Sequence, residues 1–263
     1  MRVATMPTAV REPAGHLLLD DRLSLERGLL PAPVLGRDGF RAAAHYEPGR
    51  AQALLSGDFY DVVQSEDSTV HAIIGDVSGH GPAEAALAVH LRLAWRTAVL
   101  CGRTQLQQMG MLERILVQER TSDETFATVV SLRFPPGGHS VTAVNAGHPG
   151  IILRRSREVR WVEPQTGIAL GFFPGHEDWV ETRIELSPRD GVVLLTDGVF
   201  EGRTGRATRL GEEGLLRLAA RRSHLPAQEF IDALVGDAAA MAAPFGGLSD
   251  DVAVLQLGWN VPG

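Results

Sequence analysis

The sequence has little of three things that define large classes of protein: cysteine, long apolar runs and concentrated positive charge. One cysteine, Cys101, cannot form an internal disulfide or a zinc cluster, and its apolar surroundings predict a buried thiol. No run reaches the roughly 18–20 apolar residues of a membrane span, and the first 21 residues lack a signal-peptide core. We therefore expect a cytoplasmic protein without a membrane segment.

The net charge of the chain limits the kinds of partner that it can bind. The net charge is −7 and the arginines are scattered along the chain. Nucleic acids select dense basic patches, so no nucleic-acid partner is expected. A negative chain is suited instead to collecting cations.

What the chain does have is a real core, since 44% of its 263 residues are hydrophobic. Residues 1–36, rich in Pro, Gly and Arg, are predicted to be an N-terminal tail with a candidate docking helix at 17–30. Residues 37–260 are predicted to form one domain. Short β-like runs recur there, at 39–46, 58–64, 69–75, 126–134, 140–145, 150–155, 158–163, 179–186, 191–196 and 251–258.

Four helices are predicted between these strands, at about 83–100, 104–119, 212–222 and 226–241. Pro82 is a favourable first-turn residue for the first of them. Because strands and helices do not alternate one for one, a doubly wound parallel sheet is disfavoured. The pattern favours an α+β fold with antiparallel sheets covered by helices.

Two acidic motifs flank a predicted hairpin. GDFYD occupies 57–61 and GDVSGHG occupies 75–81, with the polar turn SEDS between the two strands. In an antiparallel pair the start of one strand lies beside the end of the other. Asp58 is therefore predicted to lie next to Asp76.

Two further motifs stand at the ends of apolar runs. Asp197 follows VVLLT directly, and the pair Asp250 and Asp251 precedes VAVLQL. If these strands are antiparallel neighbours, their aspartates also share one edge of a sheet.

Several carboxylates at one site repel one another unless a cation compensates them. Oxygen ligands of this kind suit Mg²⁺ or Mn²⁺. Two such ions about 3.5–4 Å apart can lower the pKa of a shared water from about 15.7 toward about 7. A single aspartate before glycine is more often a turn residue, but four such motifs beside apolar strands favour a metal centre.

With these motifs the sequence resembles the PPM family, the protein phosphatase 2C-like serine/threonine phosphatases, and within it the bacterial SpoIIE-like branch. The resemblance runs from Phe40 to Leu257. Its further motifs are TFATVV (125–130), NAGHPG (145–150), GIALG (167–171), TDGVFE (196–201) and DDVAVL (250–255). Ser56 and Ala253 depart from the usual glycine and threonine, and the phosphate-binding arginine of eukaryotic members has no clear counterpart.

The resemblance implies a four-layer αββα sandwich of two antiparallel sheets with helices outside, and two Mn²⁺ or Mg²⁺ ions at one edge. Asp76 would bridge both ions and the Val77 carbonyl would complete the second site. Asp197 and Asp250 would hold the first ion, and Asp58 would bind or orient the waters of the second site. Asp251 could exchange roles with Asp250, and Asp123 is a faint candidate for a third, weaker ion.

The implied activity is hydrolysis of phosphoserine or phosphothreonine by a water that two metal ions activate. The implied substrate is a phosphorylated protein such as an anti-sigma-factor antagonist, in signal transduction that controls sigma factors and the stress response. Homodimerisation through the region before the domain is a further expectation. Two alternatives stay open: a non-catalytic partner-binding module of the same fold, and a small-molecule phosphoesterase.

Three local predictions complete the sequence analysis. Phe59 and Tyr60 alternate on one strand, so one should face the core and the other a groove or the surface. His148 is expected to cap a hairpin turn away from the metals. The Gly- and Arg-bearing stretch 199–212 is either a substrate-recognising flap or a solvated loop.

Overall fold

The computed structural model describes residues 33–36, 39–49, 56–155, 158–187 and 189–259. Pro31–Gly263 forms one compact unit. Val34, within the predicted tail, forms a parallel bridge with Val63. The predicted docking helix at 17–30 lies outside the described residues.

The first sheet carries the predicted hairpin. Its order is β2-β3-β4-β5-β8, and β9 pairs with the remaining part of β5. All its pairings are antiparallel except β5 with β8. The strands are β2 (Asp58–Gln64), β3 (Val70–Val77), β4 (Ala127–Phe134), β5 (Ser140–Ala146), β8 (Thr166–Gly167) and β9 (Thr182–Glu185).

The second sheet has the order β1-β11-β10-β6-β7 and is antiparallel throughout. Its strands are β1 (Phe40–Glu47), β6 (Ile151–Arg155), β7 (Glu158–Val162), β10 (Asp190–Leu195) and β11 (Val252–Trp259). Each predicted strand is found, and among the described residues the two-residue β8 is the one strand that was not predicted.

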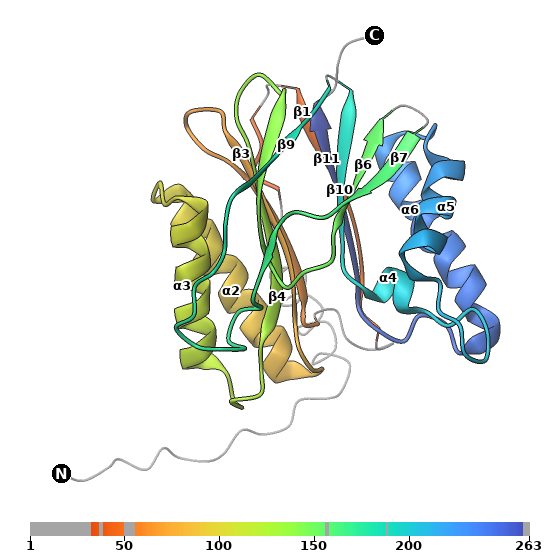
Figure 1. The fold of residues 1–263 in the computed structure, drawn as a ribbon, viewed down its shortest axis with the longest axis horizontal. Helices are drawn as coiled ribbons and strands as arrows, with labels where there is room; N and C mark the ends of the chain where they lie inside the picture. The colour runs from red at the N-terminus through yellow and green to blue at the C-terminus, as the bar shows by residue number, and fades with distance from the viewer. Residues whose placement is uncertain (1–32, 37–38, 50–55, 156–157, 188, 260–263) are drawn as a thin grey trace, which may run out of the picture. The chain divides into compact units, whose positions relative to one another are not determined.

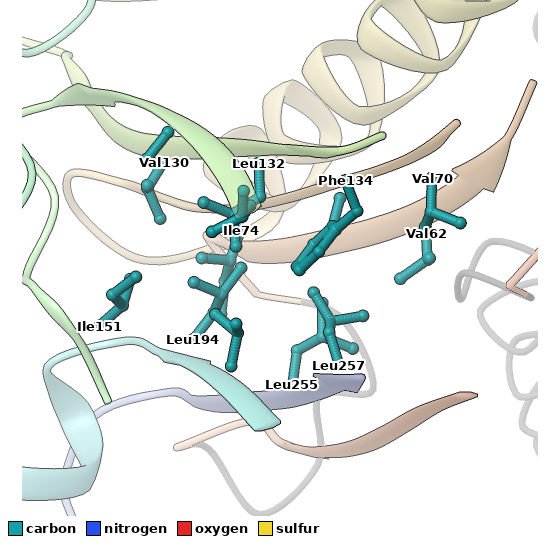
Figure 2. Close-up of a cluster of buried hydrophobic side chains, with 14 of the residues drawn as sticks. Val62, Val70, Ile74, Val130, Leu132, Phe134, Ile151, Leu194, Leu255 and Leu257 are labelled. Atoms are coloured by element: carbon teal, nitrogen blue, oxygen red, sulfur yellow. The ribbon is translucent and has the colours of Figure 1, made fainter. Parts of the chain in front are cut away.

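The two sheets face each other across a core to which both contribute apolar side chains (Figure 1). Figure 2 shows side chains of the first sheet, such as Ile74 and Phe134, pointing toward Leu194 and Leu255 of the second. A pair of helices covers the outer face of each sheet. The αββα sandwich is therefore confirmed.

The helices on the first sheet are α2 (Pro82–Leu100) and α3 (Gln105–Glu119). Pro82 begins α2 as predicted, and Thr104 begins α3 with a reciprocal capping box to Gln107. The second sheet is covered by α5 (Gly211–Arg222) and α6 (Ala227–Ala242). Two short helices, α4 (Gly198–Glu201) and η1 (Ala243–Phe245), lie near the acidic motifs in sequence.

Two predictions about side-chain environment were wrong. Phe59 packs under the helices and Tyr60 packs between the sheets, so both are buried, because β2 has a covered layer on each face. Cys101 is exposed, because it caps the C-terminal end of α2 instead of lying on its buried side. Within the described residues, no helix combines the length and apolar character that crossing a bilayer requires.

Candidate metal centre at the edge of the sandwich

The first two acids meet as the hairpin predicts. Asp58 lies directly opposite Asp76 in the β2–β3 register, and Gln64 lies opposite Val70 at the other end. Asp58 is buried, with 4% of its surface exposed. The two carboxylates thus stand side by side at one end of the first sheet.

The other acids stand at the ends of neighbouring strands in the second sheet. β10 and β11 are antiparallel, with Leu195 opposite Val254, so Asp197 and Asp251 follow at the same edge. Gly198 is required there, because a Cβ at this position would lie 1.9 Å from the Asp251 carbonyl oxygen. Close approach of these two loops therefore depends on a glycine.

Thr196 joins the two pairs of acids across the sandwich. Its hydroxyl donates to the Asp58 carboxylate at 2.7 Å and accepts from the Ala253 amide at 2.9 Å. Thr196 is fully buried. Sequence reasoning missed this residue, although its place directly before Asp197 in the TDG motif was a usable signal.

The acids perturb one another strongly. Burial, followed by repulsion from Asp197, Asp250 and Asp251, raises the pKa of Asp76 to about 7. Burial and the neighbouring Asp76 raise the pKa of Asp58 well above its usual value. A hydrogen bond from Asp58 partly offsets the upward shift of the Asp76 pKa. A cation bound by these carboxylates would relieve the repulsion that raises both pKa values.

Asp197 belongs to the same group. Burial raises its pKa first, and the nearby Glu201 and Asp250 raise it further. Five aspartates, Asp58, Asp76, Asp197, Asp250 and Asp251, thus interact electrostatically at one edge. A divalent cation would relieve the repulsion among them.

The carboxylate and carbonyl oxygens at this edge are the kind of donor that hard divalent cations prefer. Besides the carboxylates, the Val77 carbonyl oxygen faces Gly57, where a Cβ would lie 2.6 Å from it and 3.2 Å from an Asp76 oxygen. Oxygen donors of this kind suit Mg²⁺ and Mn²⁺. Across the described part of the chain, no group of three or more Asp, Glu, His or Cys side chains is arranged so that it could hold a metal ion. The carboxylates meet in pairs.

The two aspartates of the final acidic pair, Asp250 and Asp251, have different surroundings. One Asp251 oxygen accepts the Gly49 amide at 2.7 Å, which ties the loop after β1 to this edge. Asp250 is exposed and raises the pKa of both Asp76 and Asp197. Asp251 in turn raises the pKa of Asp58 and Asp76, so each member of the final pair acts on two of the other acids. Asp123 is exposed and forms an ion pair with Arg120 at 3.2 Å.

His148 forms a second link between the sheets. Its Nε2 lies 3.2 Å from the Leu195 carbonyl, which can only accept, so Nε2 carries the proton and Nδ1 accepts from the Thr128 hydroxyl at 3.0 Å. Thr128 lies opposite Asp76, and Leu195 ends β10 just before Asp197. The predicted turn is present, since Asn145 hydrogen-bonds to the backbone of His148 on both sides, but the imidazole itself is buried between β4 and β10.

Two cavities open beside the acids. One of about 440 Å³ runs from Asp197 past His148 and Phe200 to Glu212. The other, of about 330 Å³, is bordered by Gly198 and Asp250. A larger hollow of about 700 Å³ lies along α3, and none of the edge acids lines it.

Comparison with solved structures shows that the chain has the fold of PP2C domains. The RsbU and RsbW domains of a Mycobacterium tuberculosis protein match with a TM-score of 0.72 and 27% identity, over 90% of this chain and 64% of that one. The SiaA PP2C domain of Pseudomonas aeruginosa matches with a TM-score of 0.76 and 18% identity, over 93% of this chain and 97% of that one.

Sequence comparison then gives the family. The profile of the Stage II sporulation protein E (SpoIIE) family matches residues 66–260, so the chain belongs to this family. The phosphoserine phosphatase RsbP of Bacillus subtilis (strain 168) is 24% identical over 180 residues, which are 67% of this chain and 43% of RsbP. The chain spans less than half the length of the curated relatives it matches.

Proposed function

We propose that the protein is a metal-dependent serine/threonine phosphoprotein phosphatase. The observation that carries the proposal is the meeting of Asp58, Asp76, Asp197 and Asp250 at one edge of a SpoIIE-family sandwich. Among the relatives in sequence, RsbP bears the name of a phosphoserine phosphatase.

Asp76 is assigned to both cations, because its pKa is raised by Asp197, Asp250 and Asp251 together. Asp197 and Asp250 are assigned to the first cation, and Asp58 with the Val77 carbonyl to the second. Two bound Mn²⁺ or Mg²⁺ ions would supply an activated water and neutralise the charge of the phosphoryl group. Thr196 would orient Asp58 through the hydrogen bond they share.

The substrate we propose is a protein phosphorylated on serine or threonine, such as an anti-sigma-factor antagonist. Support comes from relatives named for the Rsb proteins, including the RsbU and RsbW domains found together in one chain. An open edge with two adjoining cavities suits a protein segment better than a small metabolite, which is usually enclosed.

The test is release of phosphate from p-nitrophenyl phosphate and from phosphoserine peptides with Mn²⁺ present. We expect hydrolysis that EDTA abolishes and that Asp76→Asn lowers by about 10³-fold or more, in line with losses from essential catalytic groups. Glu66→Gln is the matched control, since it removes one negative charge from the exposed turn at the other end of the same hairpin. Equal activity in the two variants would refute the proposal.

Calorimetric titration and a wider substrate panel separate the alternatives. A partner-binding module would bind Mn²⁺ weakly in calorimetric titration and hydrolyse neither substrate. A small-molecule phosphoesterase would prefer small phosphate esters to phosphorylated proteins in a substrate panel.

A further inference from the structure

A short hairpin follows the helix that begins at Asp197. Arg203 and Arg209 face each other in an isolated antiparallel bridge. Backbone hydrogen bonds close the hairpin on both sides of this bridge, from Thr204 to Thr208 at 2.9 Å and from Leu210 to Gly202 at 3.0 Å. Opposite residues of an antiparallel pair project from the same face, so the two guanidinium groups share one side of the hairpin.

The hairpin is seated against the segment that leads to Asp250. A Cβ on Gly202 would lie 2.6 Å from the end of the Leu248 side chain and 3.1 Å from the Ala242 Cβ, so the two segments are closely packed here. The cavity of about 330 Å³ between them is lined by both arginines and by Glu201, Ser249 and Asp250. The cavity thus joins two cations to the edge where the acids meet.

The charged side chains of this cavity wall are not all paired with one another among the described residues. Like charges directly opposite each other in a strand pair are destabilising. Glu201 compensates Arg209 by an ion pair. Within the described residues, no carboxylate pairs with Arg203, which is exposed toward solvent.

We propose that Arg203, with Arg209 beside it, forms an oxyanion-binding subsite for the substrate. The inference rests on the proposed function and adds a recognition element to it. A guanidinium group binds phosphate or carboxylate oxygens through its planar fork of donors. An acidic edge also repels an approaching phosphoryl group, and cations at its rim offset that repulsion during encounter.

Two sources of the oxyanion share this chemistry. One is the phosphoryl group that is hydrolysed, and the other is an acidic side chain next to the phosphoserine. Three substrates distinguish them: p-nitrophenyl phosphate, a phosphoserine peptide with neutral neighbours, and the same peptide with aspartate neighbours.

The test compares Arg203→Ala with Arg206→Ala in Mn²⁺. Arg206 lies near the tip of the same hairpin, is exposed and does not line the cavity, so it is a matched control. We expect Arg203→Ala to raise KM about tenfold while kcat changes by less than about twofold, because the contact serves ground state and transition state alike. Arg203→Lys should recover only part of the loss, since lysine keeps the charge without the fork.

A KM effect on all three substrates, with weaker inhibition by inorganic phosphate, assigns the subsite to the reacting phosphoryl group. An effect confined to the aspartate-flanked peptide assigns it to the neighbouring acid. Unchanged KM in Arg203→Ala, or an equal change in Arg206→Ala, overturns the proposal. If the unmodified protein hydrolyses nothing, the same comparison is made by binding. Fluorescein-labelled versions of the two peptides are titrated with each variant in Mn²⁺, and binding is measured by fluorescence anisotropy. Arg203→Ala should then weaken binding about tenfold, and no change overturns the proposal.

Discussion

Thr196 shows how one hydroxyl can couple two sheets. It donates to a buried carboxylate of the first sheet while it accepts from a buried amide of the second. Because a hydroxyl is both donor and acceptor, threonine meets both needs with one atom. Valine has nearly the same shape and meets neither.

Thr196→Val should therefore lower the free energy of unfolding by about 1–3 kcal/mol, because it leaves the Ala253 amide buried without a partner. It should also weaken Mn²⁺ binding, because Asp58 loses the bond that orients it. Urea unfolding and calorimetric titration measure the two effects. Thr196→Ser, which keeps the hydroxyl, should restore both, and a serine variant as impaired as valine would contradict this account.

His148 is the residue from which a pH dependence follows. Burial lowers its pKa from 6.5 to about 4 in the folded protein. Between these two values the unfolded chain binds more protons than the folded one, so the contribution of His148 to stability falls as pH decreases.

From pH 7 to pH 5 this contribution should fall by about 2 kcal/mol. Other titrating groups act in the same range, so the measurement is a difference between two proteins. His148→Gln keeps a donor and an acceptor but does not titrate, and its free energy of unfolding should fall less than that of the unmodified protein. Identical pH profiles would show that His148 does not carry this dependence.

At the scale of elements, a buried ion pair fastens α2 to β2. The Asp61 carboxylate is fully buried and accepts from Arg96 at 2.7 Å and from Arg92 at 3.4 Å, both from α2. Asp61 lies on the same strand as Asp58, three residues after it. The second aspartate of GDFYD thus binds the helix layer through its arginine partners, whereas the first belongs to the acidic edge.

Asp61→Ala should lower the free energy of unfolding by about 3–5 kcal/mol, because it removes the carboxylate that pairs with the buried Arg92. Asp123→Ala breaks an exposed pair with Arg120 and should cost less than about 1 kcal/mol. Urea midpoints at unchanged m-values measure both changes. Similar losses in the two variants would contradict a structural role specific to Asp61.

At the scale of the whole molecule, the two sheets bring together acids that lie far apart in sequence. Asp58 and Asp76 come from one sheet, and Asp197 and Asp250 flank strands of the other. Packing of the sheets through the core in Figure 2 therefore sets the charge density of the edge. A cation that binds this edge should stabilise the folded sandwich.

Mn²⁺ at 100 times its dissociation constant should add about 2.7 kcal/mol to the free energy of unfolding, or on the order of 5–10 °C in Tm. EDTA should remove the increase. Glu66→Gln should retain it and Asp76→Asn should lose most of it, as measured by thermal unfolding. The same increase in both variants would place the ion elsewhere.

The strands, the four long helices and both acidic pairings could be predicted from the sequence, because they depend on local patterns. Apolar runs between turn residues mark the strands, and antiparallel pairing places Asp58 beside Asp76 without knowledge of the rest. The motif order also carried the family resemblance, which the SpoIIE match bears out.

Only the tertiary structure decided which side chains join the two sheets. Thr196, His148 and Asp61 find their partners across layers, at sequence separations that no local period records. For the same reason Tyr60 proved buried and Cys101 exposed, since burial depends on what packs against an element as well as on its own pattern. The acids of the edge were thus visible in the sequence, whereas the contacts that hold them together required the fold.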